Sequence, residues 1–282
     1  MNKMRCIWRD AVHNFWGRRL LVFCFFQFTI LHYYTDSIKQ YAIAAQYPAA
    51  PWVLPFMGQN VYFQFVYGIS VVCFYSNVPF MPGYEMYVLM RQGRMWWVSA
   101  KLLRIWISAV MLVVTTFVLS ILPLVPNLEW TFRWGKLYYS LALTDAGTVH
   151  HVKLFFSYDL INENSALATV LILFAIMFIV TGLTGTIMFA LSIGVGRTAA
   201  VLAGTFLAVL SVVFANLYMW QEWIGFVSPF SWMDLLLLHG KVCRPAPSLI
   251  IICAGTAICG IFSYAFSLKA VRRKDFRRIE EE

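Results

Sequence analysis

The sequence predicts an all-α integral membrane protein with six transmembrane helices. Hydrophobic residues make up 61% of the 282 residues and charged residues only 12%, and the mean hydropathy is +0.70. A soluble domain carries about 25% charged residues. The chain therefore has too few polar side chains to cover a globular surface, and much of its surface must face lipid.

Six apolar runs are long enough to be membrane spans, since a helix needs about 20 residues to cross a hydrocarbon core of about 30 Å. These runs are continuous and do not alternate with polar residues, which favours helices over the strands of a barrel. Tight proline clusters and charged segments separate them. The predicted spans are 20–36, 59–77, 102–125, 166–191, 199–220 and 248–269.

The distribution of lysine and arginine predicts the orientation. Placing the N-terminus in the cytoplasm puts 16 of the 22 Lys and Arg residues in the inner segments, as cytoplasmic loops require. We therefore expect a multi-pass protein of the cell membrane with both termini cytoplasmic and a cytoplasmic tail at 270–282. The net charge of +9 then reflects topology and contact with membrane lipid, and gives no reason to expect a nucleic-acid partner.

Residues 1–18 are predicted to form an amphipathic helix lying in the plane of the inner leaflet. Trp8, Val12, Phe15 and Trp16 share one face at helical spacing. The segment leads into the first span through two arginines, which suits an interfacial helix. A signal peptide is a poorer interpretation, because the charged region is too long for one.

A second short helix is predicted at 84–92, in the cytoplasm between the second and third spans. Glu85 lies in its first turn, where the helix dipole favours an anion, and Arg91 and Gly93 end it. Its apolar side chains lie at the boundary with water. The helix either rests on the lipid headgroups or docks into a groove of another protein.

The segment between the fifth and sixth spans is aromatic and contains only two acids, Glu222 and Asp234. We expect it to re-enter the outer leaflet and to form an external gate with Glu222, Phe230 and Asp234. Irregular backbone at that depth is tolerated only where protein covers it.

The order of these parts resembles the ABC-2-type permease family, the membrane subunit of an ATP-driven exporter. Glu85 followed by Arg94, Trp97 and Lys101 is similar to the pattern in which an acidic residue opens the family's coupling helix and basic residues lead into span three. The stretch VSPFSWMDLL at 227–236 looks like the family's Ser-Pro-Phe turn before the last span.

The resemblance implies a single permease domain over 1–282 that exports a hydrophobic or amphipathic substrate, such as a peptide or an antibiotic. It implies two partners, a separate ABC ATPase subunit and a second permease copy or a paralogue. The expected contact with the ATPase consists of Tyr84, Glu85, Tyr87, Leu89 and Arg91. The expected substrate path between spans two and five consists of Tyr62, Phe65, Phe74, Phe214 and Tyr218.

The residues predict no catalytic, cofactor-binding or metal site on this chain. The nearest approach to a P-loop, GVGRTAA from Gly194, lacks the lysine and the spacing, so ATP and Mg are expected on the partner subunit. His150 and His151 are adjacent, so their rings diverge, and the six cysteines suit packing better than a disulfide framework.

Two other classes of function stay open. A non-transporting sensor or assembly factor fits the same composition. An intramembrane enzyme fits less well, because His32 is the histidine within a predicted span and H-E-x-x-H is absent. A secondary transporter would need a buried ion relay, whereas the polar intramembrane side chains are uncharged: Gln27, His32, Asn60, Gln64, Thr115, Thr116, Thr181, Thr184 and Asn216.

Overall fold

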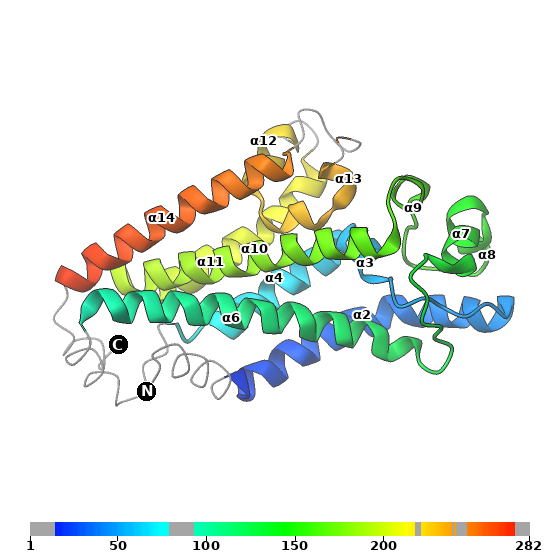
Figure 1. The fold of residues 1–282 in the computed structure, drawn as a ribbon, viewed down its shortest axis with the longest axis horizontal. Coiled ribbons are helices and arrows are strands. Elements are labelled where there is room, and N and C mark those ends of the chain that lie inside the picture. Colours follow the sequence, from blue (N-terminus) through cyan, green and yellow to red (C-terminus); the bar gives the residue numbers. More distant parts are fainter. Residues whose placement is uncertain (1–14, 79–92, 218–220, 239, 241–246, 274–282) are drawn as a thin grey trace.

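Long helices run side by side along the long axis of the molecule in the computed structural model (Figure 1). The structure describes residues 15–78, 93–217, 221–238, 240 and 247–273. Within these residues the fold is all-helical, and Ala49 and Leu128 form an isolated parallel bridge. The long helices are α2 (Arg18–Ala45), α4 (Val61–Tyr75), α6 (Arg94–Ile121), α10 (Ala166–Gly194), α11 (Arg197–Asn216) and α14 (Leu249–Arg273).

Four of the described helical segments are long and apolar enough to cross a membrane: 94–124, 166–194, 197–216 and 249–271. They indicate a multi-pass membrane protein, which confirms the predicted class. The 15 residues of α4 are fewer than a crossing helix needs, and α2 carries Asp36 and Lys39 in its second half.

The third predicted span begins earlier than expected, at Arg94 in place of Leu102. Gly93 precedes this helix with a φ of 87°, a conformation that glycine adopts without strain. Trp97, Val98 and Lys101 then continue the buried face of α6. The charged start of α6 is therefore part of one continuous helix.

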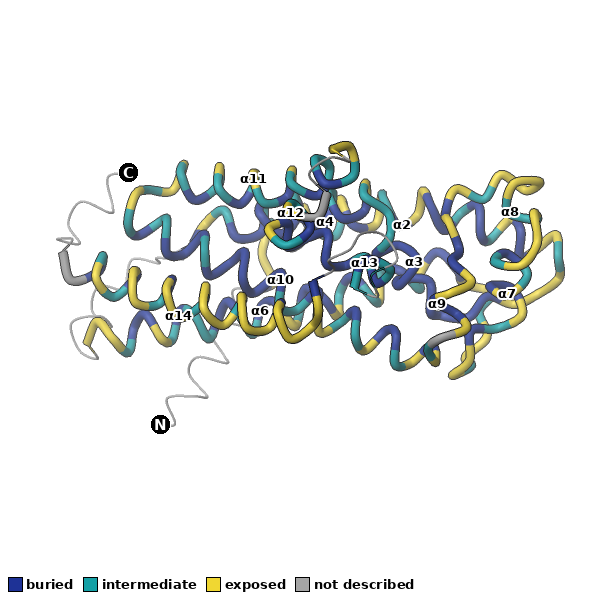
Figure 2. Tube along the Cα trace, turned by 90° about the horizontal axis from the view of Figure 1, so that it is seen from above, coloured by how far each residue is buried: buried dark blue, intermediate teal, exposed yellow. Residues whose placement is uncertain are grey.

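Helix α10 lies at the centre of the bundle and packs against α6, α11 and α14. It is apolar on all sides, as a helix surrounded by others should be, and its residues are mostly buried (Figure 2). Gly182 allows a close approach to α6, because a Cβ there would lie 2.4 Å from the Trp106 ring.

Helix α4 packs between α2 and α11. Its close contact with α11 depends on Gly68, where an added Cβ would lie 2.7 Å from the Cβ of Ala208. Two carbon atoms cannot lie this close, so position 68 accepts only glycine at the observed separation of the helices. Helices α4 and α11 are therefore in close contact.

Short helices lie beside the second half of α2 at one end of the molecule (Figure 1). They are α7 (Gly135–Leu143), α8 (Ala146–Val149) and α9 (Tyr158–Glu163), and the short 3-10 helix η1 (Leu122–Leu124) leads to them from α6. Helix α3 (Leu54–Gly58) precedes α4 and packs against them. The ring of Phe56 lies 5.2 Å from that of Trp134 and 4.6 Å from that of Phe156. This aromatic cluster gives the end cap its own small core.

The connection from α11 to α14 contains α12 (Gln221–Val227), the 3-10 helix η3 (Phe230–Met233) and α13 (Leu235–Leu238). Helix η3 contacts α4, α10 and α11. The connection therefore folds back onto the bundle.

Three predicted elements lie wholly or mostly outside the described residues. They are the amphipathic helix of 1–18, of which only the last residues are described, the helix at 84–92, and the tail at 270–282 beyond α14. They stay predictions.

Candidate functional site

Five polar side chains are buried inside the bundle along α4 and on the helices α2 and α10 that pack against it. We call Gln27, Gln64, Tyr67, Ser70 and Thr181 the polar seam; each is at most 2% exposed. The Tyr67 hydroxyl lies 2.7 Å from the Thr181 hydroxyl, and Gln27 Nε2 donates to Ser70 Oγ at 2.7 Å. These two hydrogen bonds link α4 to α10 and to α2.

The spacing of residues along α4 places three of these side chains on one face. Gln64, Tyr67 and Ser70 follow one another at intervals of three, which brings them to the same side of a helix. Ser70 Oγ donates to the Tyr67 carbonyl at 2.8 Å, and Gln64 Nε2 donates to the Gly58 carbonyl at 2.8 Å. The glutamine therefore also ties the end of α3 to α4.

The polar seam is not fully satisfied. Gln27 Oε1 and Gln64 Oε1 are buried and have no hydrogen-bond partner in the part of the chain that the structure describes. A buried acceptor without a donor costs about 1–3 kcal/mol, so a packed apolar interior would be expected to exclude such groups. The two unpaired oxygens therefore lower the stability of the bundle at the polar seam.

The turn at 228–233 closes one side of the seam. Phe230 is fully buried, and its ring centroid lies 6.4 Å from that of Tyr67. Ser228 and Ser231 join their hydroxyls at 2.7 Å, and Trp232 Nε1 donates to the Gly225 carbonyl at 2.8 Å. These hydrogen bonds hold the turn in one conformation, in which the Phe230 ring packs against α4.

Two glycines let this turn approach so closely. A Cβ on Gly58 would lie 2.7 Å from the Met233 carbonyl oxygen, and a Cβ on Gly68 would lie 3.3 Å from the Phe230 ring. The turn therefore contacts α3 and α4 at two levels. A displacement of α4 would disturb the Gly68 contact directly and the Gly58 contact through the bond from Gln64 to Gly58.

The three predicted gate residues have different places in the structure. Phe230 lies against the polar seam, as described above. Asp234 is half-buried before α13, where its Oδ1 accepts from the Leu236 N–H at 3.0 Å. Burial raises the pKa of this carboxyl to about 7, against the opposing effect of hydrogen bonds from Leu236 and Leu237. Glu222 falls in α12, and its side chain lies outside the described residues.

The predicted substrate-path residues that the structure describes differ in their exposure. Tyr62 is 69% exposed, Phe65 is half-buried, and Phe214 is buried. Phe74 is buried with its ring 5.6 Å from that of Phe15. Tyr218 lies outside the described residues, so the path stays a prediction.

The predicted contact with an ATPase falls entirely outside the described residues. This holds for each of its members: Tyr84, Glu85, Tyr87, Leu89 and Arg91.

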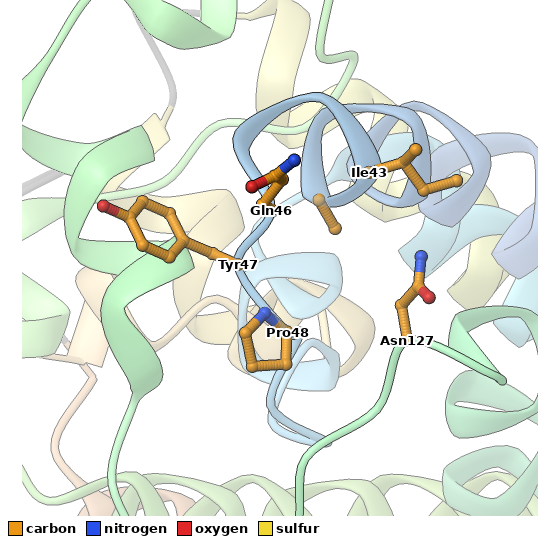
Figure 3. Close-up of a pocket in the computed structure, with 6 residues that line it drawn as sticks. Ile43, Gln46, Tyr47, Pro48 and Asn127 are labelled. Carbon is orange, nitrogen blue, oxygen red and sulfur yellow. The ribbon is translucent and has the colours of Figure 1, made fainter.

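An open hollow of about 360 Å³ lies at the end of α2 beside the Ala49–Leu128 bridge (Figure 3). Carboxamide groups of Gln46 and Asn127 and the apolar surfaces of Ile43, Tyr47 and Pro48 line it. It is separate from the polar seam, which lies among α2, α4 and α10.

Tyr67 and Ser70 were not expected as site residues from the sequence. Gln27, Gln64 and Thr181 are among the polar intramembrane side chains that the sequence identifies. The spacing of Tyr67 and Ser70 from Gln64 was a usable signal, because polar side chains on one face of an apolar helix turn toward other helices.

Comparison of the chain with protein-family models, curated proteins and solved structures gives no match. Within the described ranges, no group of three His, Cys, Asp or Glu side chains could hold a metal ion. The polar seam and the 228–233 turn both contact α4 through side-chain packing and hydrogen bonds. A movement of α4 would change these contacts.

Proposed function

We propose that the chain is the permease subunit of an ATP-driven exporter of the ABC-2 type, with six membrane crossings. Contacts at the two ends of the bundle support the two crossings by α2 and α4. After α2, the Ala49 N–H donates to the Asn127 carbonyl at 2.8 Å, and the Glu129 N–H donates back to Ala49 at 3.0 Å. Residue 49 therefore lies at the same level as the segment that follows α6.

The opposite end of the bundle supports the same conclusion. Arg197 Nε donates to the Ser76 carbonyl at 2.8 Å, and Ser192 Oγ donates to the Val78 carbonyl at 2.8 Å. The end of α4 therefore lies beside the junction of α10 and α11. Helix α10 is long enough to cross a membrane. Because α2 and the segment from α3 to α4 extend between the same two ends of the bundle, these contacts support two further crossings.

The packing of the 228–233 turn against α4 is the observation that carries the functional proposal. The predicted coupling segment at 84–92 lies between α4 and α6 in the chain, so force applied there acts on both helices. Helix α4 in turn holds Phe230 through Tyr67 and Gly68. Nucleotide-driven movement of the partner ATPase would tilt α4, loosen the turn and open the exit for a hydrophobic or amphipathic substrate.

The proposal requires a partner that hydrolyses ATP. The test is to tag the chain after Glu282, extract it in mild detergent and identify stoichiometric partners by mass spectrometry. We expect a P-loop ATPase, and we expect Glu85→Arg to remove it. Glu129→Arg is the matched control, because Glu129 is an exposed acid beside the Ala49–Leu128 bridge and outside the predicted coupling segment.

The outcomes separate the exporter from a sensor or assembly factor. Loss of the ATPase with Glu85→Arg but not with Glu129→Arg supports the proposal. A chain that purifies without any P-loop protein in several detergents contradicts it. Where the ATPase is present, its activity in the complex should depend on residues 84–92, whereas a passive sensor should tolerate their replacement.

A further inference from the structure

Two arginines from distant parts of the chain come close together at one end of the bundle. Arg19 lies in the first turn of α2, and Arg197 is the first residue of α11. The ring of Phe15, just before α2, lies 5.6 Å from that of Phe74 near the end of α4, and Arg197 bonds to Ser76 at that same end. Both positive charges therefore lie at one end of the bundle, where they repel each other. Among the described residues, Arg19 Nη1 is buried without a hydrogen-bond partner. Arg197 is held in place by the hydrogen bond from its Nε to the Ser76 carbonyl.

This arrangement is unfavourable unless an anion joins it. A buried N–H donor that bonds to nothing costs more when it is charged, and two like charges at short range add to that cost. A guanidinium presents its donors in a planar fork that matches two oxygens of a phosphate. A phosphate between the two arginines would satisfy the free donor and remove the repulsion.

The surroundings favour a phosphate that carries acyl chains. Leu21 is 70% exposed and Phe25 68% exposed on α2, just beyond Arg19. On α11, Leu202 is 70% exposed and Phe206 62% exposed, beyond Arg197. On each helix these side chains lie on a different side from the arginine. In a membrane they would face acyl chains, so the arginine pair lies at the edge of a surface that contacts lipid.

We propose that Arg19 and Arg197 together bind the phosphate of an anionic glycerophospholipid. The lipid site requires insertion of the chain into a membrane but does not require the exporter function. Lipid binding is measured on the purified chain without any ATPase, so a negative result for the lipid site leaves the proposed exporter function untouched, and the reverse also holds.

The experiment measures lipid binding to the full chain in a neutral detergent by native mass spectrometry. Phosphatidylglycerol is titrated against phosphatidylcholine, and inorganic phosphate alone is tested as a free anion. We expect Arg19→Gln to weaken phosphatidylglycerol binding about fivefold, since one basic group near an anionic surface contributes about 1 kcal/mol. Arg18→Gln removes the same charge from the exposed neighbouring position and should have little effect.

Thermal stability gives a second readout that does not depend on binding stoichiometry. Without lipid, Arg19→Gln should melt at the same temperature as the parent or higher, because the repulsion is gone. Phosphatidylglycerol should then stabilise the parent and the Arg18→Gln chain, but not the Arg19→Gln chain. Equal binding by all three chains would overturn the site, and equal stabilisation by inorganic phosphate would overturn its assignment to a lipid.

Discussion

Replacing Phe230 with alanine tests the contact between the 228–233 turn and α4. Phe230 is fully buried and touches the Tyr67 ring. Truncating a fully buried phenylalanine typically costs about 3–5 kcal/mol, because the transfer free energy is lost and a cavity remains. For a chain of this size we expect the melting temperature to fall on the order of 5 to 15 °C.

The assay is thermal unfolding of the purified chain in detergent, followed by tryptophan fluorescence. Phe262→Ala is the matched control, because the Phe262 ring is 73% exposed on α14 and its truncation leaves no buried cavity. Phe230→Leu should lose much less than Phe230→Ala, since leucine fills most of the space. Equal melting temperatures for Phe230→Ala and Phe262→Ala would refute the packing of this turn against the bundle.

Three further substitutions test neighbouring features. Gly68→Ala should destabilise the chain by about 1–3 kcal/mol in thermal melts, because the new Cβ would lie 2.7 Å from that of Ala208. Gly255→Ala is the control and should be neutral or stabilising, because a Cβ there meets nothing within 4 Å. A larger loss of stability from Gly255→Ala than from Gly68→Ala would contradict the close contact of α4 with α11. Tyr67→Phe should cost about 1–2 kcal/mol through loss of the bond to Thr181, and a similar loss from Tyr62→Phe on the exposed side would speak against the polar seam. Burial raises the pKa of Asp234 to about 7, so the folded chain binds more protons than the unfolded chain between about pH 4 and 7. The free energy of unfolding should therefore fall as the pH rises through 7. Asp234→Asn should flatten this dependence, and an unchanged pH profile would show that Asp234 is not its source.

The class of fold was predictable because continuous apolar runs allow few alternatives. Helices α10, α11 and α14 match their predicted spans to within a few residues, since each is bounded by polar or glycine-containing segments. The second predicted span, 59–77, was harder to define: α4 covers only Val61–Tyr75, and the separate short helix α3 (Leu54–Gly58), which contains a proline and a glycine, precedes it. Hydropathy measures the composition of a segment and does not show where its backbone turns.

The candidate site was only partly predictable. Phe230 was expected at an external gate, and the structure buries it against α4. Its partner Tyr67 was not identified, because a tyrosine in an aromatic-rich helix gives no sign of whether its hydroxyl meets another helix. Hydrogen bonds such as that from Tyr67 to Thr181 join positions far apart in the sequence, and only the packing of the helices brings them together.

The number of crossings is the central structural claim, and cysteine labelling from outside the cell tests it most directly. The six native cysteines are first replaced, and single cysteines are introduced at three exposed positions: Trp16, Tyr47 and Trp130. Six crossings predict that Tyr47→Cys and Trp130→Cys react with an impermeant reagent in intact cells, and that Trp16→Cys reacts only after permeabilisation. If Tyr47→Cys behaved like Trp16→Cys, everything before α6 would lie on one side of the membrane, and the six-span permease would be wrong.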